Sequence, residues 1–269
     1  MSLSIQTNVS SLLALDHLRV NTDFQQRTIE RLSSGYRINS SGDDAAGLAV
    51  ANSYRSSVAE LNQGVRNAND GVSTLQIVDG GLSNITKMLD RLKTLATQGA
   101  SDTFTGDPAT LQGEMDKIVT EITRQANNIG LDTAGTNLKS LSVYIGGSTA
   151  TVSLDLSGQA VDATGLSIGA LKVDTTAHAT AAIQSITDAL ALVGGVQGAV
   201  GAGQNELGYA INLATSQVSS YSAAESRVRD ADIASEAANL TKAQVLQQSS
   251  MAALAQANSA PQSVLTLFK

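Results

Sequence analysis

A long apolar stripe runs along residues 58–96, with members that recur at alternating steps of three and four. The members are Val58, Leu61, Val65, Ala68, Val72, Leu75, Val78, Leu82, Ile85, Leu89, Leu92 and Ala96. This spacing places all of them on one face of an α-helix, and a repeat near seven residues per two turns needs a partner helix to bury that face. The phase holds across Gly71 and slips by one residue near Gly80. The pattern therefore predicts one helix from Asp43 to about Gln98, with a break at Gly80 as the alternative.

Further stripes predict helices over residues 5–32, 108–129, 176–225 and 226–269, and Pro261 is expected to end the last one. The helix that begins at Pro108 should run back antiparallel against the long helix.

Between residues 136 and 174 the period of the pattern changes to two. Val152, Leu154 and Leu156 alternate with polar residues, and residues 143–145 precede a Gly-Gly pair. These signals predict a β-hairpin. A further short strand is expected from three apolar residues that follow it, Leu166, Ile168 and Val173.

These elements predict a mainly α fold: a long antiparallel helical bundle or coiled-coil rod, with a small β-hairpin region and paired terminal helices. We expect a discontinuous terminal-helix domain of residues 1–42 and 226–269, and a central helical domain of residues 43–225 that includes a β region at about 136–175. The terminal stripes find no partner within the central domain, so we expect them to form an interface between subunits. The residues predicted for that interface are Ile5, Leu12, Leu18, Leu32, Ile233, Leu240, Leu246 and Leu254.

Charge and composition narrow the possible partners. The formal net charge is −7, and residues 1–42 and 226–269 carry +1 each, which leaves −9 on the middle of the chain. Nucleic acid is therefore an unexpected partner, since phosphate binding needs clustered Lys and Arg. We also expect no membrane span, since no run of 18 apolar residues occurs, and no cleaved signal peptide, since residues 1–15 lack a basic region.

Candidate chemistry is sparse. His17 and His178 are interpreted as isolated surface residues, and the pair Asp43 and Asp44 suits a helix N-terminus better than acid–base catalysis. The glycine-rich run 194–203 lacks the Gly-Lys-Ser/Thr ending of a phosphate loop and lies between helical stripes, so it predicts a helix. We expect no enzyme activity, no cofactor and no metal.

Several segments at both ends of the chain resemble one family. Residues 32–49 read LSSGYRINSSGDDAAGLA, residues 66–71 read RNANDG, and residues 226–236 read SRVRDADIASE. Together with residues 245–248 and 254–258, these segments are similar to bacterial flagellin. The resemblance implies a structural subunit that polymerises with itself into the flagellar filament, with the terminal helices in an inner layer. It also implies unfolded export through the flagellar type III apparatus, an export chaperone and cap proteins as partners, and a location outside the cell.

Two alternatives stand beside this hypothesis: a hook–filament junction protein, and an extracellular helical adhesin or signalling module. The sequence departs from the usual family pattern at Gln197 and Glu206, where arginines are common.

The resemblance also implies a contact with the flagellin-sensing Toll-like receptor. Arg91 would be its polar anchor, Leu95 an apolar contact and Glu121 an acidic contact. In the alternative interpretation, Arg91 is a solvated surface residue and Leu95 a packing residue.

Overall fold

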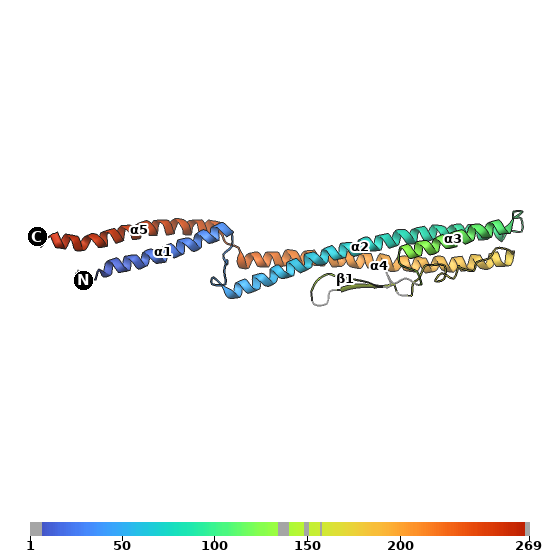
Figure 1. Ribbon diagram of the computed structural model, residues 1–269, viewed down its shortest axis with the longest axis horizontal. Coiled ribbons are helices and arrows are strands. Elements are labelled where there is room, and N and C mark those ends of the chain that lie inside the picture. The colour runs from blue at the N-terminus through green and yellow to red at the C-terminus, as the bar shows by residue number, and fades with distance from the viewer. Residues whose placement is uncertain (1–6, 134–139, 148–150, 157, 267–269) are drawn as a thin grey trace. The chain divides into compact units, whose positions relative to one another are not determined.

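A computed structural model describes residues 7–133, 140–147, 151–156 and 158–266. Two of the helices are very long, and a two-stranded hairpin lies between the third helix and the fourth (Figure 1). The elements are α1 (Val9–Ser34), α2 (Ala45–Gly99), α3 (Pro108–Asn128), β1 (Ser140–Tyr144), β2 (Thr151–Asp155), α4 (Thr176–Arg229) and α5 (Ile233–Thr266). The predicted mainly α class with a small hairpin is confirmed.

The chain divides into two compact units. The terminal unit comprises Met1–Ser56 and Ser220–Lys269, and the central unit comprises Ser57–Ser219. Both α2 and α4 pass from one unit into the other. The domain borders predicted at 42/43 and 225/226 separate the helices expected to form the interface between subunits from the rest of the chain. They stay a prediction.

The α2 helix continues without a break for 55 residues, through Gly71 and Gly80. Its predicted apolar stripe forms much of the core of the central unit, where it meets the buried faces of α3 and α4. Fully buried members of this core are Leu75, Leu82, Ile85, Leu89, Leu92, Met115, Ile122, Ile186 and Val193. The alternative of two shorter helices is therefore wrong: the break signals at Gly80 are local, whereas the stripe that must be buried is continuous.

Glycines on α2 allow close neighbours. A Cβ added at Gly64 would lie 1.5 Å from the carbonyl oxygen of Ile145, and one added at Gly81 would lie 2.4 Å from Cγ2 of Ile129. The α3 helix runs antiparallel to α2, as predicted: Ile129, just beyond its C-terminus, meets Gly81, and Glu114 near its start meets Arg91.

The hairpin is attached to one face of α2. Val143 pairs with Val152 in an antiparallel register. Two donors reach the Glu60 carboxylate: the hydroxyl of Tyr144, at 2.6 Å from Oε1, and the backbone N–H of Gly147, at 2.9 Å. These hydrogen bonds hold the pKa of Glu60 below its usual value and raise that of Tyr144.

The third strand expected at Leu166, Ile168 and Val173 is not formed among the described residues, although all three side chains are buried. Local turn bonds occupy this backbone instead. The N–H groups of Ile168 and Gly169 both donate to the carbonyl of Ala163, so they are not available to a ladder.

The α5 helix also differs from expectation, since it continues through Pro261 to Thr266. Proline has no backbone N–H, so the carbonyl of Ala257, four residues earlier, lacks its helical donor. The side-chain amide of Asn8 donates to that carbonyl at 2.7 Å. This bond from α1 satisfies the acceptor and removes one reason for the helix to end at the proline.

Candidate assembly surface on the terminal helix pair

The α1 and α5 helices form an antiparallel pair whose contacts are largely polar. Asn8 binds the Ala257 carbonyl at one end, and Arg31 Nη1 lies 3.4 Å from Glu236 Oε1 at the other. Between them, Asn21 Nδ2 donates to Ser250 Oγ at 3.0 Å. Among the side chains of the two helices that the structure describes, the buried ones are Thr28, Glu236 and Ala243. Small and polar side chains therefore make up the fully buried part of this seam, and most of the large apolar residues of the pair remain exposed.

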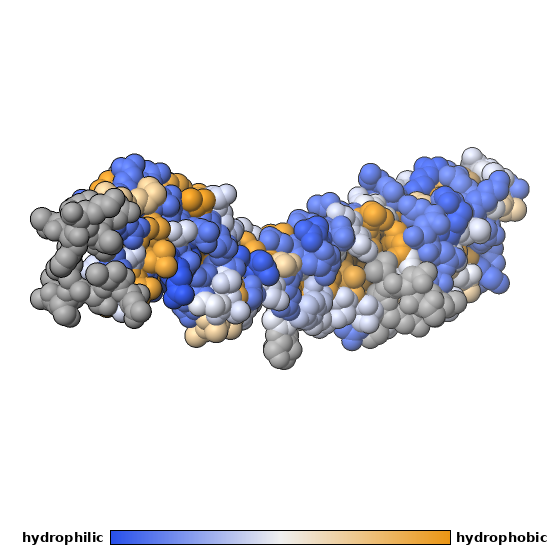
Figure 2. All heavy atoms as spheres, turned by 60° about the vertical axis from the view of Figure 1, so that its left-hand side comes forward, coloured by the Kyte–Doolittle hydropathy of each residue, from blue (hydrophilic) through white to orange (hydrophobic). Residues whose placement is uncertain are grey.

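The apolar side chains of the pair remain largely exposed. Leu12 is 59% exposed, Leu13 58%, Ile233 49% and Val245 60%. Figure 2 shows apolar side chains gathered on the surface of this part of the chain. Other large apolar residues of the pair with at least 38% exposure are Val9, Leu15, Val20, Ile29, Leu246 and Met251. An apolar face of this extent marks a surface for a partner.

Three of the residues predicted for an interface between subunits belong to this exposed face, and the assignment of all eight to an interface stays a prediction. Leu12, Ile233 and Leu246 are exposed, and Leu18, Leu32, Leu240 and Leu254 are half-buried. Ile5 lies outside the described residues. Leu13, Val20 and Val245 also belong to the exposed face. Helical periodicity does not predict them, because each falls beside the single stripe that the period selects, whereas two paired helices leave a wider face uncovered.

A small clasp closes the base of the pair. The backbone N–H of Arg37 donates to the carbonyl of Arg229 at 2.6 Å, and that of Ala231 donates to the carbonyl of Gly35 at 2.9 Å. The Arg229 guanidinium lies 4.1 Å from the ring centroid of Tyr36, a cation–π contact. The two connecting segments of the terminal unit are thus bound to each other.

The first of these segments also prepares the start of α2. Asp44 Oδ1 accepts from the N–H of Gly47 at 2.9 Å and caps the helix, as predicted. The neighbouring Asp43 accepts backbone N–H groups from Ser40 at 3.0 Å and Asn39 at 3.2 Å. These bonds lower the pKa of the Asp43 carboxyl.

The three residues assigned to a receptor contact have different environments. Arg91 forms an ion pair with Glu114, with Nη2 and Oε1 2.6 Å apart. Glu121 pairs with Arg124 on the same helix, and this bond lowers the pKa of Glu121. Leu95 is only 1% exposed and belongs to the core of the central unit.

Catalytic and metal-binding features are scarce. The described residues contain no group of three or more His, Cys, Asp or Glu that could hold a metal ion. The interpretation of His178 as isolated is wrong, because its Nδ1 forms a hydrogen bond with Asp174 four residues earlier, and this bond lowers the pKa of Asp174. Both side chains are more than half exposed, so the pair lies on the surface at the start of α4.

By length and composition alone, α4 is apolar enough to cross a membrane. Its apolar stripe, however, is already used inside the central unit, where Leu207 meets Gly71 of α2. Length and composition therefore do not by themselves establish a membrane span, and the expected absence of one stays a prediction.

Comparison with known proteins defines the class of this chain. The family model for the bacterial flagellin N-terminal helical region matches residues 5–138, and that for the C-terminal helical region matches residues 183–268. The chain is 33% identical to a flagellin of Halalkalibacterium halodurans over 270 residues, which cover 98% of this chain and 99% of that one. It is 36% identical to the flagellar filament 30.7 kDa core protein of Treponema maltophilum over 287 residues, with the same coverage. The crystal structure of Bacillus cereus flagellin has a TM-score of 0.48 and 28% identity, over 60% of this chain and 94% of that chain.

The chain belongs to the bacterial flagellin family. Its role is that of a structural subunit of the flagellar filament, located outside the cell.

Proposed function

We propose that subunits polymerise by burying the exposed apolar face of the α1–α5 pair against the same pair in neighbouring copies, while the central unit carries the stable fold of each subunit. The single observation that supports this most is the exposure of large apolar residues such as Leu12 and Val245, which are 59% and 60% exposed. In the central unit, by contrast, the members of the α2 stripe are largely buried.

The size of the driving force is in keeping with assembly. Burial of a fully exposed Leu, Ile, Val or Met side chain contributes about 1.5–3 kcal/mol. About ten such residues on the pair are roughly half exposed. Their burial would supply on the order of 10 kcal/mol, which is comparable with the cost of lost translational and rotational freedom on association.

The test is seeded polymerisation of the purified full chain, with the critical concentration measured by sedimentation. Leu12→Asp should raise the critical concentration at least tenfold, because it places a carboxylate on the apolar face. Ser10→Asp is the matched control, since it adds the same charge at the same exposed end of α1. If both variants assemble at the wild-type concentration, this face does not carry assembly.

We infer further partners from membership of the family. An export chaperone and cap proteins would meet the same exposed face before and during assembly, since an uncovered apolar face favours aggregation. The Toll-like receptor contact would use Arg91 and Glu121, whose side chains are 55% and 44% exposed, whereas Leu95 would support them from the core. Receptor activation that is unchanged by Arg91→Ala would rule this contact out.

A further inference from the structure

Polar contacts join the α1 segment to α5 along the length of the pair. Asn8, Asn21 and Arg31 each contact α5, and the hydroxyl of Ser11 donates to Asn258 Oδ1 at 3.0 Å. These contacts set residues 8, 11, 21 and 31 against residues 257, 258, 250 and 236, so they belong to one antiparallel register. We call these four contacts the polar ladder.

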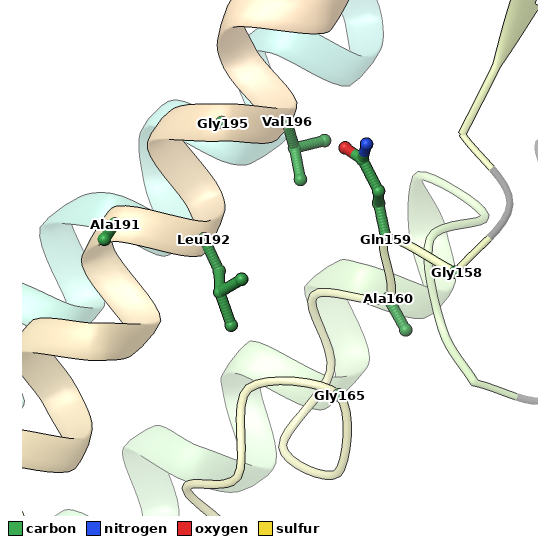
Figure 3. A pocket seen from close by; sticks show the side chains of 8 residues that line it. All are labelled: Gly158, Gln159, Ala160, Gly165, Ala191, Leu192, Gly195 and Val196. Atoms are coloured by element: carbon green, nitrogen blue, oxygen red, sulfur yellow. The ribbon is translucent and has the colours of Figure 1, made fainter.

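The polar groups inside the pair are satisfied in this register. In the described part of the chain two buried side-chain polar atoms lack a hydrogen-bond partner, Gln159 Oε1 and Arg229 Nε, and both lie outside α1 and α5. Gln159 belongs to the central unit, where it lines a cavity of about 320 Å³ (Figure 3). A buried polar network whose members are all paired favours one arrangement, because other arrangements leave some of its groups unpaired.

The contact of Asn8 depends on a carbonyl that α5 frees at one position. Pro261 is the only proline in α5, and its missing N–H leaves the Ala257 carbonyl without a helical donor. The Asn8 amide donates to this carbonyl at 2.7 Å. A shift of one heptad would set Asn8 beside the carbonyl of Ser250, which the N–H of Leu254 already occupies within the helix. Asn8 therefore finds its free acceptor in the observed register.

The contact of Arg31 depends on a buried carboxylate. Glu236 is 8% exposed, and its Oε1 lies 3.4 Å from Arg31 Nη1. One heptad further along α5 is Ala243, which offers Arg31 no partner. A shift in that direction would separate Glu236 from its cation, and a buried charge without a partner is strongly destabilising. The two ends of the ladder thus penalise shifts by different means.

The register also decides the shape of the exposed apolar face. Leu12 and Leu13 belong to α1, whereas Val245 and Leu246 belong to α5, so the face is composed of residues from both helices. A shift of one heptad would move one half of the face by about 10 Å along the other. Apolar contacts are non-directional, so they distinguish poorly between such registers.

We propose that the polar ladder fixes the register of α1 against α5 and thereby gives every copy the same apolar face. Asn8 with the Ala257 carbonyl and Arg31 with Glu236 are the positioning contacts. The inference rests on the proposed function for its role in assembly, since the face it shapes is the one that subunits would bury. The register itself is a property of a single chain, and it can be measured separately from assembly.

Cysteine pairs report the register directly, because the chain contains no cysteine. Asn21→Cys/Ser250→Cys reports the observed register, in which these two side chains are hydrogen-bonded. Asn21→Cys/Ala243→Cys and Asn21→Cys/Ala257→Cys report shifts of one heptad in either direction. Each pair is placed in the full chain and oxidised, both in the free subunit and after seeded assembly, and disulfides within one chain are quantified by mass spectrometry. Only the first pair should close efficiently, because a disulfide requires Cα atoms within about 7 Å.

The decisive variant, combined with each cysteine pair, is Asn8→Asp/Arg31→Met/Glu236→Leu. Asp keeps the acceptor of the helix cap but cannot donate, and apolar residues of similar volume in place of a buried ion pair are often neutral or stabilising. The helices should therefore still pair, while the ratio of shifted to observed disulfides rises at least about tenfold. Arg27→Met/Glu30→Leu is the matched control: it removes the same two charges from exposed positions of α1 and should leave the ratio unchanged.

The ratio of disulfides separates a role in register from a role in stability, since mere loss of stability would weaken all three disulfides together. If the triple variant keeps the ratio seen without it, or if the shifted pairs close as well as the observed pair in the wild-type background, the inference is wrong. Both results leave the proposed function standing, because that function is tested by the critical concentrations of Leu12→Asp and Ser10→Asp.

Discussion

Replacement of Gly64 by alanine tests how tightly the hairpin is held against α2. A Cβ at this position would lie 1.5 Å from the carbonyl oxygen of Ile145, 2.2 Å from its carbonyl carbon and 2.7 Å from its Cα. All three atoms belong to the backbone, so a change of side-chain rotamer cannot relieve the clash. The hairpin would have to move away from α2, and the hydrogen bonds of Tyr144 and Gly147 to Glu60 would be strained.

The magnitude follows from two opposing terms. Overpacking of a buried position costs typically 1–3 kcal/mol, and a backbone clash belongs at the upper end of that range. Alanine returns about 1 kcal/mol through its higher helix propensity. Gly64→Ala should therefore destabilise the central unit by about 2 kcal/mol or more, which corresponds to a fall of about 1 M in the urea midpoint.

The assay is urea unfolding of the free subunit, followed by circular dichroism at 222 nm. Gly80→Ala is the matched control on the same helix, because its Cβ meets no described atom within 4 Å, and it should stabilise the subunit by up to about 1 kcal/mol. Equal midpoints for the two variants would refute the reasoning that the Ile145 carbonyl requires glycine at position 64.

Three further predictions concern the terminal unit and assembly. Asn8→Ala should destabilise the α1–α5 pair by about 2 kcal/mol, because it removes the acceptor for the Ser11 N–H and the donor to the Ala257 carbonyl. Asn8→Asp keeps the acceptor and should cost about half as much. Amide hydrogen exchange near the two helix ends should be faster in Asn8→Ala than in Asn8→Asp, and equal exchange in the two variants would contradict this. Since the folded-state pKa of Asp43 is lowered, its stabilising contribution is present above the unfolded pKa and is lost as the pH falls through the folded value. Asp43→Asn should therefore lower the Tm at pH 7 and flatten its decline below about pH 4, and parallel Tm curves would be the contrary result. Because salt screens repulsion between copies and sulfate strengthens apolar burial, the critical concentration should fall in sodium chloride and fall further in ammonium sulfate, whereas a rise in both would mean that ion pairs hold the polymer.

Much of the fold followed from the apolar period alone. The unbroken course of α2 past Gly80 could be predicted because burial of a continuous stripe outweighs one or two local break signals. The hairpin followed from the alternation at Val152 and Leu154. The helix end expected at Pro261 was wrong, because the donor that satisfies the Ala257 carbonyl comes from Asn8, 249 residues before Ala257 in the chain. Such distant compensation leaves no local signal in the sequence.

The candidate surfaces were only partly predictable, for a similar reason. The helical period identifies apolar residues such as Leu12, but only the structure shows that the pairing of α1 with α5 leaves Leu12 uncovered. The sequence also does not show which helical glycines are required by close neighbours. Gly64 and Gly198 both lie inside predicted helices, yet Gly64 packs against the carbonyl of Ile145, whereas Gly198 faces open space. The distinction depends on the neighbours that the fold supplies.

The clasp at the base of the terminal pair has a mechanical consequence. The segment after α1 and the segment before α5 are tied to each other by backbone hydrogen bonds at Arg37 and Ala231 and by the stacking of Arg229 on Tyr36. Two connecting segments joined in this way bear tension in parallel. A load on the terminal helices is therefore shared between both segments and does not stretch either one alone. In a filament that is twisted and bent as it rotates, shared loading of this kind keeps the strain from falling on one connecting segment alone.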